Sequence, residues 1–162
     1  MKKILVLVVF VSSGLISLAQ KKETKDAGAN YSYECRCIGS ELDGSITLEA
    51  WGKGRNYLDA SEQAKKNAVR DVIFNGIKNG NESCQKGAIL IGARPEEKYE
   101  DYFATFFADE GEYLKYVSLK DERIVNKVKR DAKKAEEFQQ RMVVVRVNRQ
   151  ALKKKLAEDK IN

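Results

Sequence analysis

The sequence predicts an α+β fold in two layers, in which a long alanine-rich helix packs across one face of a mostly antiparallel or mixed sheet of about four strands. The helix is expected over residues 56–79, where Ala60, Ala64 and Ala68 recur every four positions within a wider apolar stripe of helical period. Elsewhere apolar and polar side chains alternate with period two, as in half-buried strands. The expected strands span residues 31–38, 45–51, 113–119 and 142–147.

The first two strands are expected to pair as a hairpin around the dipeptide Asp43-Gly44, which is typical of tight turns. Gly52 and Gly54 then mark the passage into the helix, for which Asn56 is the expected N-cap. A Gly-x-Gly before a helix can also bind phosphate. This one lacks the third glycine of a dinucleotide fingerprint and the Gly-Lys-Ser/Thr of a P-loop, so we interpret both glycines as turn residues.

A second helix is expected to begin at Pro95 and to carry the densest aromatic cluster of the chain, which ends at Gly111. Aromatic stripes of this kind are usually buried, so core packing is the favoured interpretation. A groove for a partner or ligand is the alternative. If one edge of the cluster is exposed, the expected contact residues are Tyr102, Phe106 and Tyr113.

The last third of the chain is less regular. Residues 120–140 fit both a helical period and an edge strand, and we favour helix for residues 131–140. Residues 142–147 are rich in β-branched side chains and predict a buried strand. Asn148 is then the expected N-cap of a terminal helix that runs to about residue 159.

The N-terminal residues have the pattern of a secretory signal peptide. Lys2 and Lys3 precede a short apolar core, and small residues at positions 17 and 19 predict cleavage between Ala19 and Gln20. The alternative, a membrane anchor, is disfavoured because the apolar run is shorter than the roughly 20 residues that span a bilayer. We therefore expect a signal peptide over 1–19, a flexible leader over 20–30 and a single domain over 31–162, in a periplasmic or secreted protein.

Export makes the three cysteines informative, because disulfides persist in oxidising compartments. Cys35 and Cys37 are two residues apart in an expected strand, where a bridge between them would be strained. A disulfide between Cys84 and either Cys35 or Cys37 is expected, which leaves one thiol over. The alternative is three buried free cysteines that act as small hydrophobic residues.

The formal net charge of +6 is distributed unevenly. Residues 20–119 hold 14 basic and 17 acidic residues, a net charge of −3, whereas residues 120–162 hold 14 basic and 7 acidic residues, a net charge of +7. A solvated helix face explains this basic third most simply, and a patch that binds anionic lipid or polymer is the alternative. Because acidic residues interleave and the chain is exported, nucleic acid is not an expected partner. The residues of the expected patch are Lys127, Lys129, Arg130, Lys133, Lys134, Lys153, Lys154 and Lys155.

The chain contains no histidine, which removes the usual general base and the commonest metal ligand. The cysteine spacing does not match a structural zinc site either, so we expect no metal and no cofactor. A pair of carboxylates such as Glu34 and Glu49, which lie across the expected hairpin, is the remaining route to catalysis. We do not expect an enzyme.

Two segments together resemble a known envelope domain. They are Gly54-Arg55-Asn56, which leads into the alanine helix, and the late run VVVRVNRQALKKKL at residues 143–156. This pair is similar to the N-terminal region of the flagellar T-ring protein FlgT and to related short outer-membrane lipoproteins. The resemblance implies a non-enzymatic α+β module that assembles with other cell-surface components. The chain departs from it in lacking a lipid-attachment cysteine at the cleavage site and in carrying the aromatic cluster.

These observations lead to one principal hypothesis, a non-enzymatic exported protein of the cell envelope that acts as a binding or assembly module. Its expected partner is an envelope protein or a cell-wall component, and it is not expected to span a membrane. Two alternatives stay open. One is a small carboxylate-dependent enzyme that modifies carbohydrate or peptidoglycan, and the other is a basic surface module for anionic polymer or lipid.

Overall fold

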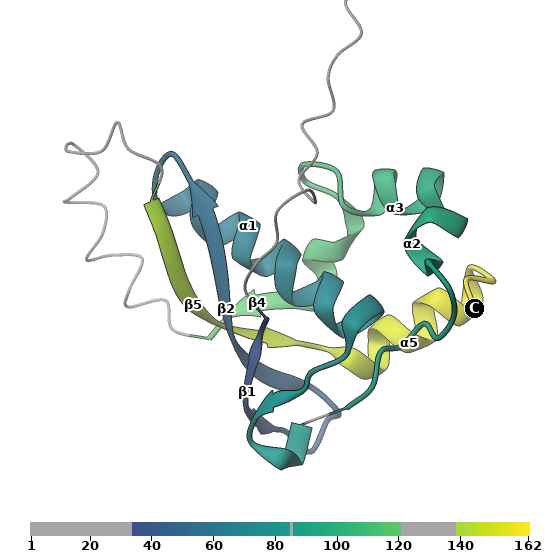
Figure 1. The fold of residues 1–162 in the computed structure, drawn as a ribbon, viewed down its shortest axis with the longest axis horizontal. Coiled ribbons are helices and arrows are strands. Elements are labelled where there is room, and N and C mark those ends of the chain that lie inside the picture. The colour runs from purple at the N-terminus through teal and green to yellow at the C-terminus, as the bar shows by residue number, and fades with distance from the viewer. Residues whose placement is uncertain (1–33, 85, 121–138) are drawn as a thin grey trace, which may run out of the picture. The chain divides into compact units, whose positions relative to one another are not determined.

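The computed structural model describes residues 34–84, 86–120 and 139–162, and the expected signal peptide and leader lie outside these ranges. It shows an α+β fold built on a five-stranded mixed sheet with the order β3-β1-β2-β5-β4 (Figure 1). Only the β1–β3 pair is parallel. The strands are β1 (Arg36–Ser40), β2 (Ile46–Gly54), β3 (Asn79–Gly80), β4 (Val117–Leu119) and β5 (Gln139–Val147).

The centre of the sheet is the antiparallel pair β2–β5, whose register runs from Ile46 opposite Val147 to Gly54 opposite Gln139. Two details of the predicted sheet need correction. The sheet has five strands rather than four, because the two-residue β3 has no apolar alternation that could reveal it. The last strand begins at Gln139, so the helix expected over 131–140 does not reach residues 139 and 140. The remainder of the ambiguous stretch, 121–138, lies outside the described residues.

Helix α1 (Tyr57–Arg70) follows β2 and continues into a π-helical turn, η1 (Asp71–Asn75). Asn56 is its N-cap, as predicted, and accepts a 3.0 Å hydrogen bond from the backbone N–H of Asp59. The helix was expected to reach residue 79 but ends at Gly76. There the backbone turns to a positive φ of 72°, and the Gly76 N–H donates to the carbonyl of Asp71.

Gly52 and Gly54 are not turn residues, as the sequence suggested, but lie inside β2 against α1. A Cβ on Gly52 would collide with the carbonyl oxygen of Ala60, and one on Gly54 would collide with the backbone N of Ala60. These glycines therefore let the first turns of α1 approach the strand backbone closely.

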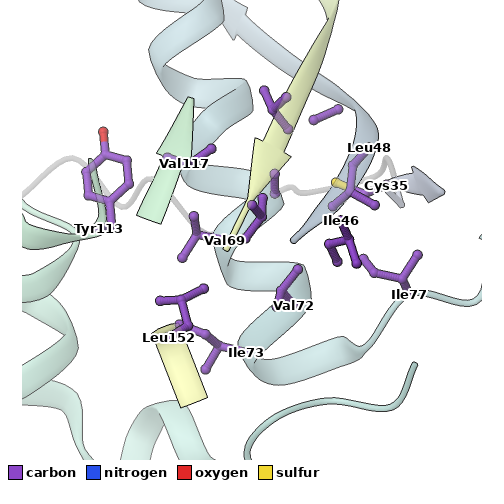
Figure 2. Close-up of a cluster of buried hydrophobic side chains, with 14 of the residues drawn as sticks. Cys35, Ile46, Leu48, Val69, Val72, Ile73, Ile77, Tyr113, Val117 and Leu152 are labelled. Atoms are coloured by element: carbon purple, nitrogen blue, oxygen red, sulfur yellow. The ribbon is translucent and has the colours of Figure 1, made fainter. Parts of the chain in front are cut away.

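The inner face of the sheet, the face toward α1, forms the core. Leu48 and Ala50 of β2 and Val145 of β5 are fully buried there, together with the alanine row of α1. Figure 2 shows Leu48 with Val69 and other apolar side chains that α1 and the sheet contribute to this cluster. Because side chains alternate along a strand, every second residue of β1, β2 and β5 points to the opposite, outer face.

The remaining elements differ from the prediction in two places. The helix expected from Pro95 is broken at Tyr99 into two short helices, and the strand expected over 113–119 is mostly a 3₁₀-helix followed by the short β4. The terminal helix starts after its predicted cap Asn148, whose side chain accepts from the Ala151 N–H at 2.9 Å. These elements are η2 (Glu82–Cys84), α2 (Pro95–Lys98), α3 (Glu100–Phe106), η3 (Glu112–Tyr116) and α5 (Arg149–Glu158).

Candidate functional site

The outer face of the central strand pair β2–β5 carries an exposed apolar side chain. Trp51 of β2 lies directly opposite Met142 of β5, and Met142 is 46% exposed. Ile38 sits at an irregularity in the β1–β2 register and is 44% exposed. Trp51 of β2 and Val144 of β5, which share the face of Met142, are half-buried. We define Ile38, Trp51, Met142 and Val144 as the outer apolar patch.

An ionic network borders one end of this patch. Arg146 of β5 contacts the carboxylates of Glu41 at 2.8 Å and Asp43 at 2.7 Å. Lys120 also binds Glu41, at 3.0 Å, and the hydroxyl of the buried Thr47 donates to the same carboxylate at 3.2 Å. Each cation in this network therefore has an acidic partner within the molecule.

The two carboxylates of the network stay ionised to a lower pH than usual. The hydrogen bond from Lys120 lowers the pKa of Glu41, and the hydrogen bond from the Ser45 backbone N–H lowers the pKa of Asp43. A general acid needs the opposite shift, a raised pKa that keeps its proton near neutral pH. The geometry of this cluster therefore suits ion pairing rather than proton donation.

The carboxylate pair considered for catalysis, Glu34 and Glu49, has separate partners. Glu34 accepts a 2.6 Å hydrogen bond from the side-chain amide of Asn79, while Glu49 lies 3.8 Å from Arg36 across the β1–β2 pair. Within the described ranges, no group of three or more acidic or cysteine side chains is arranged to hold a metal ion.

The aromatic cluster lies mainly inside the protein. Phe106 and Tyr113 are only 3% and 2% exposed, and Phe103 packs edge-to-face against Phe74 with ring centroids 4.7 Å apart. Tyr102 is half-buried, and its hydroxyl donates a 2.7 Å hydrogen bond to Asp159 of the last helical turn. These side chains join α3 and η3 to η1 and the end of α5, so Phe106 and Tyr113 do not lie at the surface.

The expected disulfide joins Cys37 of β1 to Cys84 of η2, with Cα atoms 5.9 Å apart. Cys35 is buried and is not part of this disulfide. Its backbone N–H donates a 2.9 Å hydrogen bond to the buried carboxylate of Asp71 in η1. The sequence left open which cysteine would pair with Cys84, and the position of η2 beside β1 selects Cys37.

Of the expected basic patch, Lys127, Lys129, Arg130, Lys133 and Lys134 lie outside the described residues. On α5, Lys154 and Lys155 form ion pairs with acidic neighbours: Lys154 lies 3.8 Å from Glu158, and Lys155 lies 3.1 Å from Asp159. Lys153 is exposed and has no acidic partner in the described part of the chain. The structure therefore brings no continuous basic surface together from the residues that it describes.

Comparison of the chain with protein-family models, with curated proteins and with solved structures found no match. None of the helices described here has the length and apolar character needed to cross a membrane. The alternation of residues 45–51 in the sequence already places Trp51 on one face of the strand and Leu48 and Ala50 on the other face. The run MVVVRV, by contrast, predicts a strand buried on both faces and gives no sign that Met142 is exposed.

Proposed function

We propose that this chain is an exported, non-enzymatic protein of the cell envelope that acts as a binding or assembly module. Its outer apolar patch is the surface that contacts a partner protein. The observation that carries this proposal is the exposure of Met142 on the outer face of β5, directly opposite Trp51, together with the exposure of Ile38 on β1. Tryptophan, methionine and arginine are enriched at protein interfaces, and an apolar centre with a polar rim is their usual plan.

The charges around the patch favour a protein partner over an anionic polymer or lipid. Arg146 is paired with Glu41 and Asp43, and Arg36 lies within 3.8 Å of Glu49. Internally paired cations offer little surplus charge to a polyanion, so burial of apolar area has to drive the association. The partner surface that fits is an apolar patch on another envelope protein.

The proposed export rests on two independent features. The N-terminal pattern predicts a signal peptide that ends at Ala19. The Cys37–Cys84 disulfide belongs to the kind of bond that forms and persists outside the cytosol. The resemblance to the FlgT N-terminal region supports an assembly role, because that domain belongs to a cell-surface structure.

The test uses residues 20–162 as bait against solubilised envelope from the host cell, with variants that change only the proposed contact. Met142→Glu places a charge in the centre of the patch, at a position exposed enough to tolerate it. Leu58→Glu, at an exposed position on α1, is the matched control. We expect Met142→Glu to lose the captured partner and Leu58→Glu to keep it, with unchanged melting temperatures.

A second readout uses the single tryptophan of the chain, Trp51. If Trp51 is replaced biosynthetically by 5-hydroxytryptophan, its emission can be followed without interference from the partner's tryptophans. Binding should shift this emission to shorter wavelength and protect it from acrylamide, because the ring leaves water. Equal capture by Met142→Glu and wild type, with no change in emission, would contradict the proposal. Binding that high salt abolishes would point instead to a charged surface.

A further inference from the structure

A half-open groove lies on another part of the molecule, where it is lined by residues of the segment that precedes α2 and by residues of α5 and the C-terminal end of the chain. Its volume of about 560 Å³ falls in the range of roughly 300–1,000 Å³ typical of small-molecule sites. The floor is apolar and well packed: Leu90, Leu156 and Ile161 line it and are all buried. Ile89 and Ala157 complete the apolar lining.

Backbone hydrogen bonds hold both walls of the groove in place. On one side, the N–H groups of Ile89 and Leu90 donate to the carbonyls of Val72 and Ile73 at 3.1 and 2.9 Å. On the other side, the Ile161 N–H donates to the Leu156 carbonyl at 2.8 Å after Lys160 has turned to a positive φ of 60°. A groove with walls fixed in this way needs little ordering when a ligand binds.

Contacts from the end of α2 hold Asn162, the last residue of the groove lining, in place. The Tyr99 hydroxyl donates a 2.7 Å hydrogen bond to the backbone oxygen of Asn162, and the Lys98 ammonium donates to the same oxygen at 3.1 Å. Asn162 itself lines the groove. The oxygen that could otherwise repel an anion there is therefore already bound by two donors.

Two lysines at the groove, one in α5 and one just after it, differ from the remaining lysines of α5. Lys153 and Lys160 line it, both are exposed, and neither has an acidic partner among the residues that the structure describes. Lys154 and Lys155, the two residues that follow Lys153, are both paired with acids. The groove thus combines an apolar floor with two cations that no described side chain neutralises.

We propose that this groove binds a monomeric anionic amphiphile, a single acyl chain that carries a carboxylate or phosphate head. The chain would lie on Leu90, Leu156 and Ile161, and the head would be bound by Lys153 and Lys160. A hydrophilic polyanion would leave the apolar floor unused, whereas a neutral apolar molecule would leave both ammonium groups without an anion. This site is separate from the outer apolar patch, so its test does not depend on the proposed partner protein.

The test measures binding of decanoate, decyl phosphate and decanol to residues 20–162 by calorimetry and by the rise in melting temperature, below the micellar concentration. Decanoate and decyl phosphate share the anionic amphiphile chemistry, and the tighter of the two identifies whether a fatty acid or a phosphate-bearing lipid is the closer match. We expect both to bind and both to raise the melting temperature. Decanol should bind at least roughly tenfold more weakly, because it lacks the charge that the lysines meet.

Two pairs of variants locate the binding. Ala157→Trp fills the groove from an exposed helix position and should abolish binding, whereas Ala104→Trp, on the exposed side of α3, should not. The double variant Lys153→Gln/Lys160→Gln should weaken decanoate roughly tenfold and leave decanol unchanged. Lys78→Gln/Lys154→Gln removes the same charge elsewhere and is the control.

Three outcomes would overturn the proposal. One is no binding of either anion. Another is binding that Ala157→Trp does not reduce. The third is association with phosphatidylglycerol vesicles in the absence of decanoate binding, which would assign the lysines to a membrane surface rather than to a monomeric ligand.

Discussion

The carboxylate of Asp71 shows how one buried polar side chain connects distant parts of the chain. It accepts the backbone N–H of Cys35 at 2.9 Å and the side-chain amide of Asn75 at 2.7 Å, within the π-helical turn. Asp71→Ala would leave the buried backbone N–H of Cys35 without this acceptor, which typically costs about 1–3 kcal/mol, whereas the amide of the exposed Asn75 can bind water instead. We expect a loss of stability of at least that size in urea unfolding at neutral pH.

The control for this prediction is Asp101→Ala, which removes an exposed carboxylate from α3. Its effect should stay within about 0.5 kcal/mol, as for most surface substitutions. If Asp71→Ala were as mild as Asp101→Ala, the hydrogen bonds of Asp71 would not hold β1 to η1.

The absence of a side chain at Gly52 is required for the close packing of α1 on β2. The structure predicts that Gly52→Ala is destabilising, because the new Cβ would strike the carbonyl oxygen of Ala60 and push α1 away from β2. Overpacking of this kind costs typically about 1–3 kcal/mol, and here the obstacle is backbone that cannot rotate aside. Thermal unfolding measures the loss.

Gly39→Ala provides the comparison, since a Cβ at Gly39 in β1 would have no atom within 4 Å. We expect its melting temperature to stay close to that of the wild type. A Gly52→Ala protein with wild-type stability would mean that α1 can shift on the sheet, and that the close approach is not required.

At the scale of elements, the sequence predicts the helices and strands that bury one face, because their apolar residues recur with a regular period. The inner face of β2 and the alanine row of α1 pack against each other and are buried. The positions that face inward recur every two residues in a strand and every three to four in a helix, so the apolar residues show the same period in the sequence. The β3 strand could not be predicted in this way, because neither of its residues is buried. Asn79 and Gly80 are exposed and join the sheet through backbone pairing with Arg36 and Cys37, which imposes no side-chain pattern.

The two surfaces proposed for binding were predictable to different extents. The position of Trp51 on the face opposite Leu48 follows from alternation alone. The groove could not be foreseen, because one of its walls, at Ile89 and Leu90, belongs to neither a helix nor a strand. Instead, Ile89 and Leu90 donate to carbonyls that the end of η1 leaves without helical partners. That contact depends on where the helix stops, which local sequence determines poorly.

The disulfide joins β1 to the 3₁₀-helix η2, which follows the two-residue edge strand β3. Cys37 and Cys84 are 47 positions apart, and a closed loop of that length stabilises a fold by roughly 2–4 kcal/mol, mainly by restricting the unfolded chain. We expect the Cys37→Ala/Cys84→Ala double variant to lose stability in this range. Thiol titration after denaturation should find one free thiol in the wild type, that of Cys35.

The matching experiment is reduction by dithiothreitol, which should destabilise the wild type and leave the double variant unchanged. Cys35→Ala should retain the disulfide and its response to reduction, because Cys35 is not part of the bond. A wild-type protein whose unfolding did not respond to the reductant would show that the disulfide is absent or has no effect on stability.

For the whole molecule, the structure predicts loss of stability at acidic pH. The folded-state pKa values of Glu41, Asp43 and Asp159 are lowered, chiefly by hydrogen bonds from Lys120, Ser45 and Tyr102 respectively. In the unfolded chain the pKa is 4.5 for Glu and 3.8 for Asp. A group whose pKa is lower in the folded state stabilises the fold at pH values above its unfolded pKa, and this stabilisation is lost as the pH falls through its folded pKa. Urea unfolding at successive pH values below 5 measures this loss, and unchanged stability down to pH 2 would contradict it.

Stability should also fall at alkaline pH, and here the cause is raised rather than lowered pKa values. Two tyrosines with pKa shifts of opposite direction test this prediction. Burial raises the pKa of Tyr113 to about 12 and also raises the pKa of Tyr102, so their contribution is complete below the unfolded value of 10.0 and is lost as pH rises through the folded values. Tyr99 is different, because the hydrogen bond from Lys98 lowers its pKa. Between pH 9 and pH 12, Tyr102→Phe should therefore lose stability less steeply than the wild type, and Tyr99→Phe more steeply. The same slope in all three proteins would mean that the hydroxyl of Tyr102 meets water rather than Asp159 and the core.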